Sequence, residues 1–305
     1  MTLAQPTDTR PTAARPASPL QRGAPILFVL LWSTGFIGAK LGLPYAGPMT
    51  FLAVRFLAVA IVMAPIAWLT GARWPSRPML WLHIAVVGLL LQFGYLGGVF
   101  TGIAHGVPAG VSALIVGLQP VLTAALAGLT LGETIRPRQW LGLGLGLIGV
   151  ALVVINPALI QPERLGAAGI TVVAMVAITL GTLYQKRFCT GVDLRATVVI
   201  QNATAGLAMA AMALLFEPFT IQWTPRFVFA IVWLAIVLSV GASMLLFQLI
   251  RHGAASRVSS LFYLTPAVTA VMAFLLFGER LSPLALVGMA LAAAGVWAVN
   301  AGARA

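Results

Sequence analysis

The chain has 305 residues, of which 60% are hydrophobic and only 8% are charged, and its mean hydropathy is +1.01. A soluble domain of this length needs more charged residues than this to cover its surface. The composition therefore favours an integral membrane protein in a lipid bilayer. The formal net charge of +12 does not indicate a nucleic-acid partner, because the basic residues are neither clustered nor interleaved with exposed aromatic residues.

Cysteine and histidine are scarce. Cys189 is the only cysteine, and the three histidines lie far apart in sequence. These counts exclude an intrachain disulfide framework and provide no ligand spacing for a metal site. We therefore expect neither a metal nor a cofactor.

The chain begins with a polar tail, and ten apolar segments follow it. Residues 1–23 are rich in Pro, Thr, Ala and Arg and lack an apolar core, which predicts a disordered cytoplasmic tail and not a cleavable signal. A bilayer core about 30 Å thick is crossed by roughly 20 apolar residues in a helix. Hydrophobic windows predict transmembrane helices at 24–43, 48–70, 79–103, 108–131, 139–156, 166–185, 196–216, 227–250, 255–278 and 283–301. Residues 302–305 are predicted to form a second short cytoplasmic tail.

The basic residues orient these ten spans. With the N-terminus inside, thirteen of the 18 Lys and Arg residues fall on the cytoplasmic side and three, Arg164, Arg226 and Arg280, fall outside. Lys40 and Arg55 lie within spans. Since retained basic residues mark the cytoplasmic side, both termini are predicted to lie in the cytoplasm, with the protein in the inner (cytoplasmic) membrane.

The two halves of the chain are similar at an offset of 146 residues. From Leu118 to Val153, 14 of 36 positions are identical to the second half without a gap, which indicates a duplication. We expect a first five-helix repeat at 24–156, an outer linker at 157–165 and a second repeat at 166–301. An odd number of helices in each repeat inverts the second copy relative to the first. Inverted repeats are typical of secondary transporters, with substrate bound near the midplane.

Four stretches resemble a known family. These are "LLWSTGFIGAKLGL", "AVRFLAVAIVMAPIAWL", "LQPVLTAALAGLTLGETIRPRQWLGLGLGLIGVALVV" and "LTPAVTAVMAFLLFGERLSPLALVGMALAAAGVWAVN". The chain from about residue 24 to 301 is similar to the EamA family of the drug/metabolite transporter superfamily. The resemblance implies ten helices around a central cavity and, from several relatives, export of metabolites or amino acids.

No Asp or Glu lies inside a predicted span. The small multidrug exporters of the same superfamily use a membrane-embedded carboxylate, so this chain departs from their pattern, and exchange of cationic drugs for protons is disfavoured.

Two basic residues within the first hairpin are candidates for function. Lys40 lies roughly 6 Å inside Pro44, and Arg55 lies roughly 10 Å inside Pro48, both in the outer half of the membrane. Intramembrane charges are costly and typically face a cavity, although each side chain could instead extend to the outer headgroups. Water, helix carbonyls or an anionic group of the substrate could compensate Arg55, the deeper charge, and a substrate carboxylate would suit an exporter of amino acids. The repeat replaces Arg55 by Gln201.

Other residues in the spans are candidates for substrate contact, bending or packing. Pro120 and Pro266 each remove a backbone hydrogen bond, so they are predicted to be either hinges or fixed kinks. Small residues predict close helix contact, either within the chain or with a second protomer. The packing candidates are Gly142, Gly146, Gly149, Gly288 and Gly295, with Ala292 between the last two. Polar residues that could line a cavity, or equally join helices, are Gln92, Tyr95, Gln119, Gln201, Asn202, Gln248, Tyr263 and Thr265.

These patterns favour a secondary transporter that exports small metabolites such as amino acids by alternating access. A non-transporting membrane scaffold or a lipid-handling protein is the alternative. A membrane enzyme is less favoured, because the sequence contains neither paired acidic residues nor a His-rich motif at a membrane face.

Overall fold

The computed structural model describes residues 19–131, 137–154, 162–242, 245, 249, 262–280 and 282–301. Within these ranges every regular element is a helix, and one isolated bridge joins Ala46 to Ile221. The first five helical elements are α1 (Pro19–Gly42), η1 (Leu43–Tyr45), α2 (Pro48–Leu69), α3 (Pro78–Gly88) and η2 (Leu89–Leu96). Next come α4 (Gly97–Ala104), α5 (Ala109–Gly117), α6 (Gln119–Leu131), α7 (Pro137–Val154) and α8 (Pro162–Phe188). The last six are α9 (Leu194–Phe216), α10 (Pro225–Val232), η4 (Trp233–Ala242), η5 (Phe262–Leu264), α13 (Thr265–Phe277) and α14 (Pro283–Ala301).

Five of the described helices are long and apolar enough to cross a membrane. They are Gly23–Tyr45, Pro48–Leu69, Pro78–Ala104, Glu163–Phe188 and Leu194–Phe216. Five shorter apolar helices accompany them, at Ala109–Thr123, Trp140–Gly149, Pro225–Ser239, Thr265–Phe277 and Pro283–Gly295. The predicted all-helical membrane architecture is therefore confirmed at this coarser level.

Proline fixes where many of these helices begin. Seven helices start at a proline, namely α1, α2, α3, α7, α8, α10 and α14. The proline ring presets the helical φ angle, and its missing N–H would have no partner in the first turn of a helix. These seven helix starts therefore agree with the preference of proline for the first turn.

Equivalent helices of the two halves have matching bounds. An offset of 146 residues relates the two starts and the two ends of α6 and α13. The same offset relates the starts of α2 and α9, the starts of α7 and α14, and the ends of α1 and α8. The π-helical segments η2 and η4 also occupy corresponding positions, with common limits of 89–96 and 235–242 at that offset.

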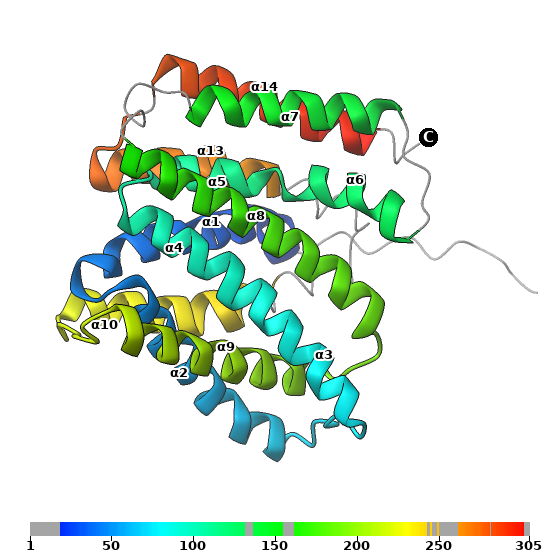
Figure 1. The fold of residues 1–305 in the computed structure, drawn as a ribbon, viewed down its shortest axis with the longest axis vertical. Helices are drawn as coiled ribbons and strands as arrows, with labels where there is room; N and C mark the ends of the chain where they lie inside the picture. Colours follow the sequence, from blue (N-terminus) through cyan, green and yellow to red (C-terminus); the bar gives the residue numbers. More distant parts are fainter. Residues whose placement is uncertain are drawn as a thin grey trace, which may run out of the picture.

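Two pairs of equivalent helices lie at opposite sides of the molecule. Figure 1 shows α7 beside α14 at the top and α2 beside α9 at the bottom, with α1, α5, α6, α8 and α13 between them. From this middle layer α1 packs against α10, η4 and α13, and α8 packs against α3, η2 and α6. The neighbours of α1 are therefore the equivalents, at the 146-residue offset, of the neighbours of α8.

Glycine allows α7 and α14 to approach closely. A Cβ atom added to Gly149 would lie 2.5 Å from the carbonyl oxygen of Gly288, and one added to Gly295 would lie 2.6 Å from that of Gly142. These two contacts are equivalent at the 146-residue offset. The small-residue faces of the two helices therefore meet each other within one chain.

The α2 and α9 helices run antiparallel, and a carboxylate joins them at each end. Glu217, after α9, accepts the N–H groups of Met49 at 2.8 Å and Thr50 at 2.9 Å, at the start of α2. At the other end Asp193 caps α9 and also accepts the N–H of Arg73 at 3.1 Å. Hydrogen bonds from the Arg195 side chain and from the Arg73 N–H hold the pKa of Asp193 well below its usual range.

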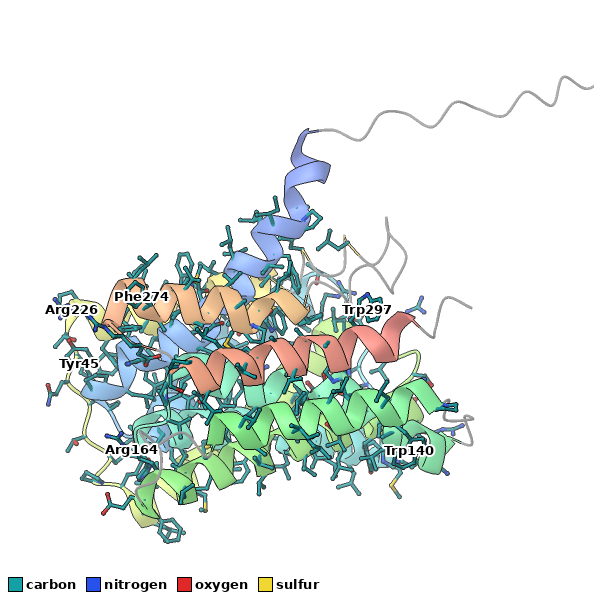
Figure 2. The ribbon with its side chains drawn as sticks, turned by 90° about the horizontal axis from the view of Figure 1, so that it is seen from above. Tyr45, Trp140, Arg164, Arg226, Phe274 and Trp297 are labelled. Carbon is teal, nitrogen blue, oxygen red and sulfur yellow. The ribbon has the colours of Figure 1, made fainter. Side chains whose placement is uncertain are left out.

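Two buried clusters form the core. The larger contains residues of α1, α2, α4, α5, α8, α9, α10, η4 and α13. Its aromatic centre is Phe51, whose ring centroid lies 5.4 Å from that of Phe100 and 5.3 Å from that of Phe227. This cluster occupies the end where Tyr45 and Arg226 lie, whereas Trp140 and Trp297 lie at the opposite end (Figure 2). The smaller cluster joins α5 and α8 to α14.

Several predicted boundaries differ from the structure. Residues 19–23, assigned to the tail, belong to α1, and residues 162–165, assigned to the outer linker, belong to α8. Both segments begin with a proline that starts a helix before the apolar window. The predicted span 108–131 is interrupted at Leu118, two residues before Pro120. Most of 243–261 lies outside the described residues.

The glycine contacts predict opposite effects for two substitutions on α7. Gly149→Ala should lower the melting temperature of the detergent-solubilised protein, because its Cβ would force the α14 backbone away. Gly144→Ala should leave it unchanged or raise it, because no atom lies within 4 Å of that Cβ position and alanine is the better helix former by about 1 kcal/mol. An equal response of the two variants would contradict this packing.

Candidate functional site

Arg55 is a buried charge about two turns into α2. Only 5% of this residue is exposed. Its Nη2 donates to the Ser239 hydroxyl at 3.4 Å, and its Nε atom has no hydrogen-bond partner among the described residues. None of the carboxylates in the described ranges forms an ion pair with it. The guanidinium therefore has an unused donor and an uncompensated charge, which an anionic ligand would satisfy.

The surroundings of Arg55 come from two π-helical segments. Ser239 lies on η4, where its hydroxyl donates to the carbonyl of Leu234 at 2.9 Å. Tyr95 lies on η2, close enough to Arg55 for an electrostatic interaction. π-Helical turns inside longer helices occur frequently at functional sites. Since η2 and η4 are equivalent in the two halves, Arg55 lies where the halves meet.

Gln201, the repeat equivalent of Arg55, is also buried. Its amide nitrogen has no partner among the described residues, and Gly88 of α3 packs directly on its backbone. Leu57 of α2 lies opposite Gly206 of α9. Because the two helices are antiparallel, Arg55 and Gln201 are displaced in opposite directions from this crossing, roughly 10 Å apart along the helix axes.

Other predicted polar residues differ in how well they are satisfied. Asn202 donates to the carbonyl of Val198 on its own helix at 2.9 Å, so its amide nitrogen is already bonded. Gln92 is half-buried on η2, the segment that carries Tyr95 and packs against α8 and α9. Arg55, Tyr95, Gln92 and Gln201 thus belong to the packed elements α2, η2 and α9.

Gln119 and Thr265 lie at two equivalent helix breaks. Gln119 donates to Thr123 at 3.1 Å and to Thr182 of α8 at 3.4 Å. The carbonyl of Thr265 accepts a bond from Ser33 of α1 at 3.4 Å, and its own buried hydroxyl has no described partner. Each break is therefore joined by a polar contact to the first helix of the other half.

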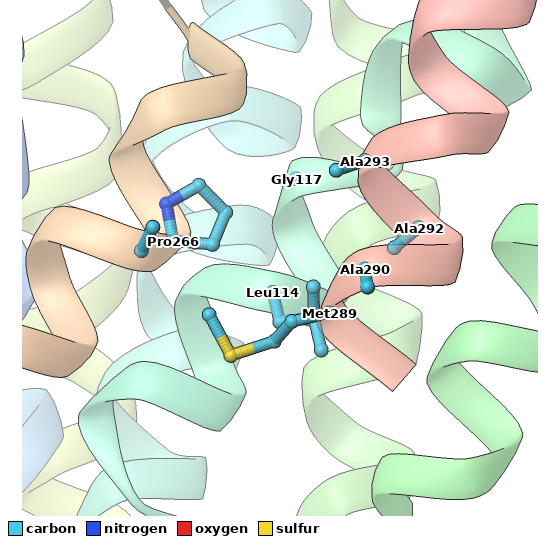
Figure 3. Close-up of a pocket in the computed structure, with 8 residues that line it drawn as sticks. Leu114, Gly117, Pro266, Met289, Ala290, Ala292 and Ala293 are labelled. Atoms are coloured by element: carbon cyan, nitrogen blue, oxygen red, sulfur yellow. The ribbon is translucent and has the colours of Figure 1, made fainter. Parts of the chain in front are cut away.

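Pro120 and Pro266 are the second residues of α6 and α13. Gly117, the last residue of α5, lies against the Pro266 ring, because an added Cβ would be 3.0 Å from its Cγ. Beside them is an apolar cavity of about 230 Å³ between α5, α13 and α14 (Figure 3). Its lining residues are Leu114, Gly117, Pro266, Ala267, Met289, Ala290, Ala292 and Ala293. None of the predicted polar substrate contacts lines it.

Lys40 has different partners from Arg55. Its ammonium group forms an ion pair with Glu279 and lies 4.9 Å from the ring centroid of Phe277. Lys40 therefore joins the end of α1 to the segment after α13. Of the remaining candidates, Gln248 and the side chain of Tyr263 lie outside what the structure describes.

Sequence reasoning missed Ser239 and Ser33. Ser239 is a single hydroxyl within an apolar run, and Ser33 forms a Ser-Thr pair with Thr34 within another, which is the signal that could have identified them. Their partners, Arg55 and Thr265, are 184 and 232 residues away in sequence. Such distant pairs follow from the fold and not from local pattern.

Known proteins resemble this chain over most of its length. It is 26% identical over 286 residues to the uncharacterized transporter YvbV of Bacillus subtilis, covering 91% of this chain and 90% of that protein. It is 26% identical over 261 residues to the uncharacterized inner membrane transporter YedA of Escherichia coli K12, covering 85% and 84%. It is 27% identical over 286 residues to a probable amino-acid metabolite efflux pump of Salmonella typhimurium, covering 89% and 92%.

A solved crystal structure of a protein has the same fold, with a TM-score of 0.64 and 21% sequence identity, over 92% of this chain and 98% of that one. The model of the EamA-like transporter family matches residues 24–155 and again residues 165–301. On this evidence the chain belongs to the EamA-like transporter family and is a multi-pass membrane transporter.

Proposed function

We propose that the protein exports small carboxylate-bearing metabolites, such as amino acids, as a secondary transporter of the inner membrane. The observation that carries this proposal is the buried Arg55, which has neither a partner for its Nε donor nor an ion pair with a carboxylate among the described residues. A guanidinium keeps its charge when buried and matches the geometry of a carboxylate. The name of the Salmonella relative, a probable amino-acid metabolite efflux pump, supports this substrate class.

Alternating access between two inverted five-helix repeats is the mechanism that we infer. Three observations support it: the helix bounds matched at 146 residues, the equivalent neighbours of α1 and α8, and the two successive matches to the family model. Ten spans would follow if each of the five shorter apolar helices belongs to a further crossing. Such repeats can exchange equivalent conformations around a site near the midplane.

The proposed orientation places both termini in the cytoplasm. Arg164 and Arg226, which the charge count assigns to the outside, lie at the same end of the molecule (Figure 2). Arg73 and Arg195, assigned to the cytoplasm, both bond to Asp193 at the other end of α2 and α9. YedA, one of the relatives, is named an inner membrane transporter.

A membrane scaffold or lipid-handling protein is the competing function, and the apolar cavity beside Pro266 is the observation that favours it. Purified protein in liposomes separates the two. A transporter accelerates saturable flux of a radiolabelled amino acid across the bilayer, whereas a scaffold gives the rate of empty liposomes.

The inverted arrangement predicts which side two equivalent positions face. Ser76 and Gln222 are both exposed and are separated by 146 residues. Cysteines placed at these positions in a Cys189→Ser background should react with an impermeant maleimide from opposite sides of the membrane. Ser76→Cys should react from the cytoplasm and Gln222→Cys from outside. Reaction of both from one side would rule out inverted repeats.

Arg55 is expected to select for a carboxylate. Arg55→Gln, which copies the residue at the equivalent position, should weaken binding of a carboxylate substrate roughly 10- to 150-fold, the scale of one hydrogen bond to a charged group. Binding of the corresponding neutral amide should change little. Arg55→Lys should restore binding only in part, because the planar fork of donors is lost. Binding can be measured by calorimetry on the purified variants.

Asn202→Ala is the matched control for Arg55→Gln. Asn202 is equally buried, but its amide already bonds to its own helix, so this variant should not distinguish acid from amide. Equal weakening of both ligands by Arg55→Gln would instead give Arg55 a structural role.

The interrupted helices are expected to act as hinges. Pro120→Ala and Pro266→Ala restore backbone N–H groups and favour a continuous helix, so each should slow flux into liposomes more than it weakens substrate binding. Melting temperatures should be unchanged or higher. If both variants transport at the wild-type rate, the prolines are fixed kinks.

A further inference from the structure

Glu279 joins three elements from both halves of the chain. Its carboxylate forms an ion pair with Lys40 at the end of α1. The same carboxylate accepts the N–H of Ala109, the first residue of α5, with Oε1 at 3.3 Å and Oε2 at 3.1 Å. Lys40 and Ala109 belong to the first half and Glu279 to the second. One side chain therefore connects the halves at the end that we assign to the outside.

The backbone before Glu279 holds it in place. Gly278 adopts a left-handed conformation with φ +67°, which only glycine adopts without strain. The N–H of Gly278 donates to Phe274 at 2.9 Å and that of Glu279 to Ala273 at 3.3 Å, which closes the end of α13. The Glu279 carboxylate consequently follows any movement of α13.

The charges around Glu279 are mutually compensating. Its side chain is only 11% exposed, against 32% for Lys40. The N-terminus of the nine-residue helix α5 favours a negative charge, and the Lys40 ammonium compensates it further. Removing one charged partner leaves the other partly buried without compensation, so these contacts favour the state in which α1, α5 and α13 are together.

The contact lies at the edge of the larger buried cluster. Ala39, Ala109 and Ala273 are buried members of that cluster, and Phe277 packs against it. Moving α1 and α5 away from α13 at this end would open the cluster and would also break every contact of the Glu279 carboxylate. The apolar packing and the ion pair therefore favour the same closed arrangement.

We propose that Glu279 is an outer latch, which must release both Lys40 and the N-terminus of α5 before α1 and α5 can separate from α13 at this end. This inference rests on the proposed alternating-access function. Glu217 provides a contrast at the same end. Its carboxylate also bonds to N–H groups at a helix start, but it joins α2 to α9, the paired helices that we expect to move together. Loss of Glu279, and not of Glu217, should favour the outward-open state.

A buried cysteine can report this opening without any substrate. Ser112 on α5 is fully buried, and its hydroxyl has no hydrogen-bond partner among the described residues, so Ser112→Cys removes no bond. In the full chain with Cys189→Ser, the rate of modification by an impermeant maleimide added outside measures access to this position.

Glu279→Gln should raise the modification rate of Ser112→Cys at least about tenfold, since a charge-assisted hydrogen bond is lost. Lys40→Gln should act in the same direction and serves as a second test if Glu279→Gln folds poorly. Glu217→Gln should leave the rate within about twofold of the parent. An unchanged rate in both Glu279→Gln and Lys40→Gln, or an equal rise with Glu217→Gln, would overturn the latch.

The charge swap tests the role of α5. Lys40→Glu combined with Glu279→Lys restores opposite charges but puts an ammonium group at the N-terminus of α5. The modification rate of Ser112→Cys should therefore fall only part of the way back to that of the parent. Complete restoration would show that α5 takes no part. These modification rates can be measured without transport. If the rates change as expected but the protein transports no substrate into liposomes, the proposed function is refuted and the latch is not. If the protein transports substrate but the rates do not change, the latch is refuted and the proposed function is not.

Discussion

Close contact between equivalent helices is the constraint on which the rest of the structure depends. Gly149 and Gly295 let α7 and α14 meet at backbone distance, and α2 meets α9 through Gly206 and Leu57. With these pairs in place, α1 packs against α10, η4 and α13, and α8 packs against the equivalent α3, η2 and α6. Glycine at these positions is needed for space and not for backbone flexibility, since added Cβ atoms would overlap neighbouring main chain.

The buried polar residues Arg55 of α2 and Gln201 of α9 depart from this internal symmetry. Equivalent positions carry a permanent charge in one half and a neutral amide in the other, Arg55 and Gln201, and each has a nitrogen without a partner in the described part of the chain. Two symmetric guanidiniums would double the cost of burying charge, whereas one charge provides a single preferred position for an anion. A duplicated fold can thus carry an asymmetric pair of buried polar residues at equivalent positions.

Sequence predicted the fold better than it predicted the contacts. Apolar windows located the long helices, and the family resemblance was confirmed by the match to both halves. The start of α1 was wrong by five residues, because Pro19 begins a helix within a polar segment. Pro120 predicted a bend, but the interruption lies at Leu118, where the turn forms before the proline. The bonds of Arg55 to Ser239 and of Lys40 to Glu279 join the two halves, so no local pattern indicated them.

The central claim is that this protein moves carboxylate metabolites out of the cell, and the composition of the growth medium tests it most directly. Small molecules should be compared by mass spectrometry between cells that overproduce the wild-type protein and otherwise identical cells that lack it. The account predicts that amino acids or related carboxylates are enriched in the medium of the overproducing cells and that neutral metabolites are not. Identical media, or enrichment confined to compounds without a carboxylate, would contradict it.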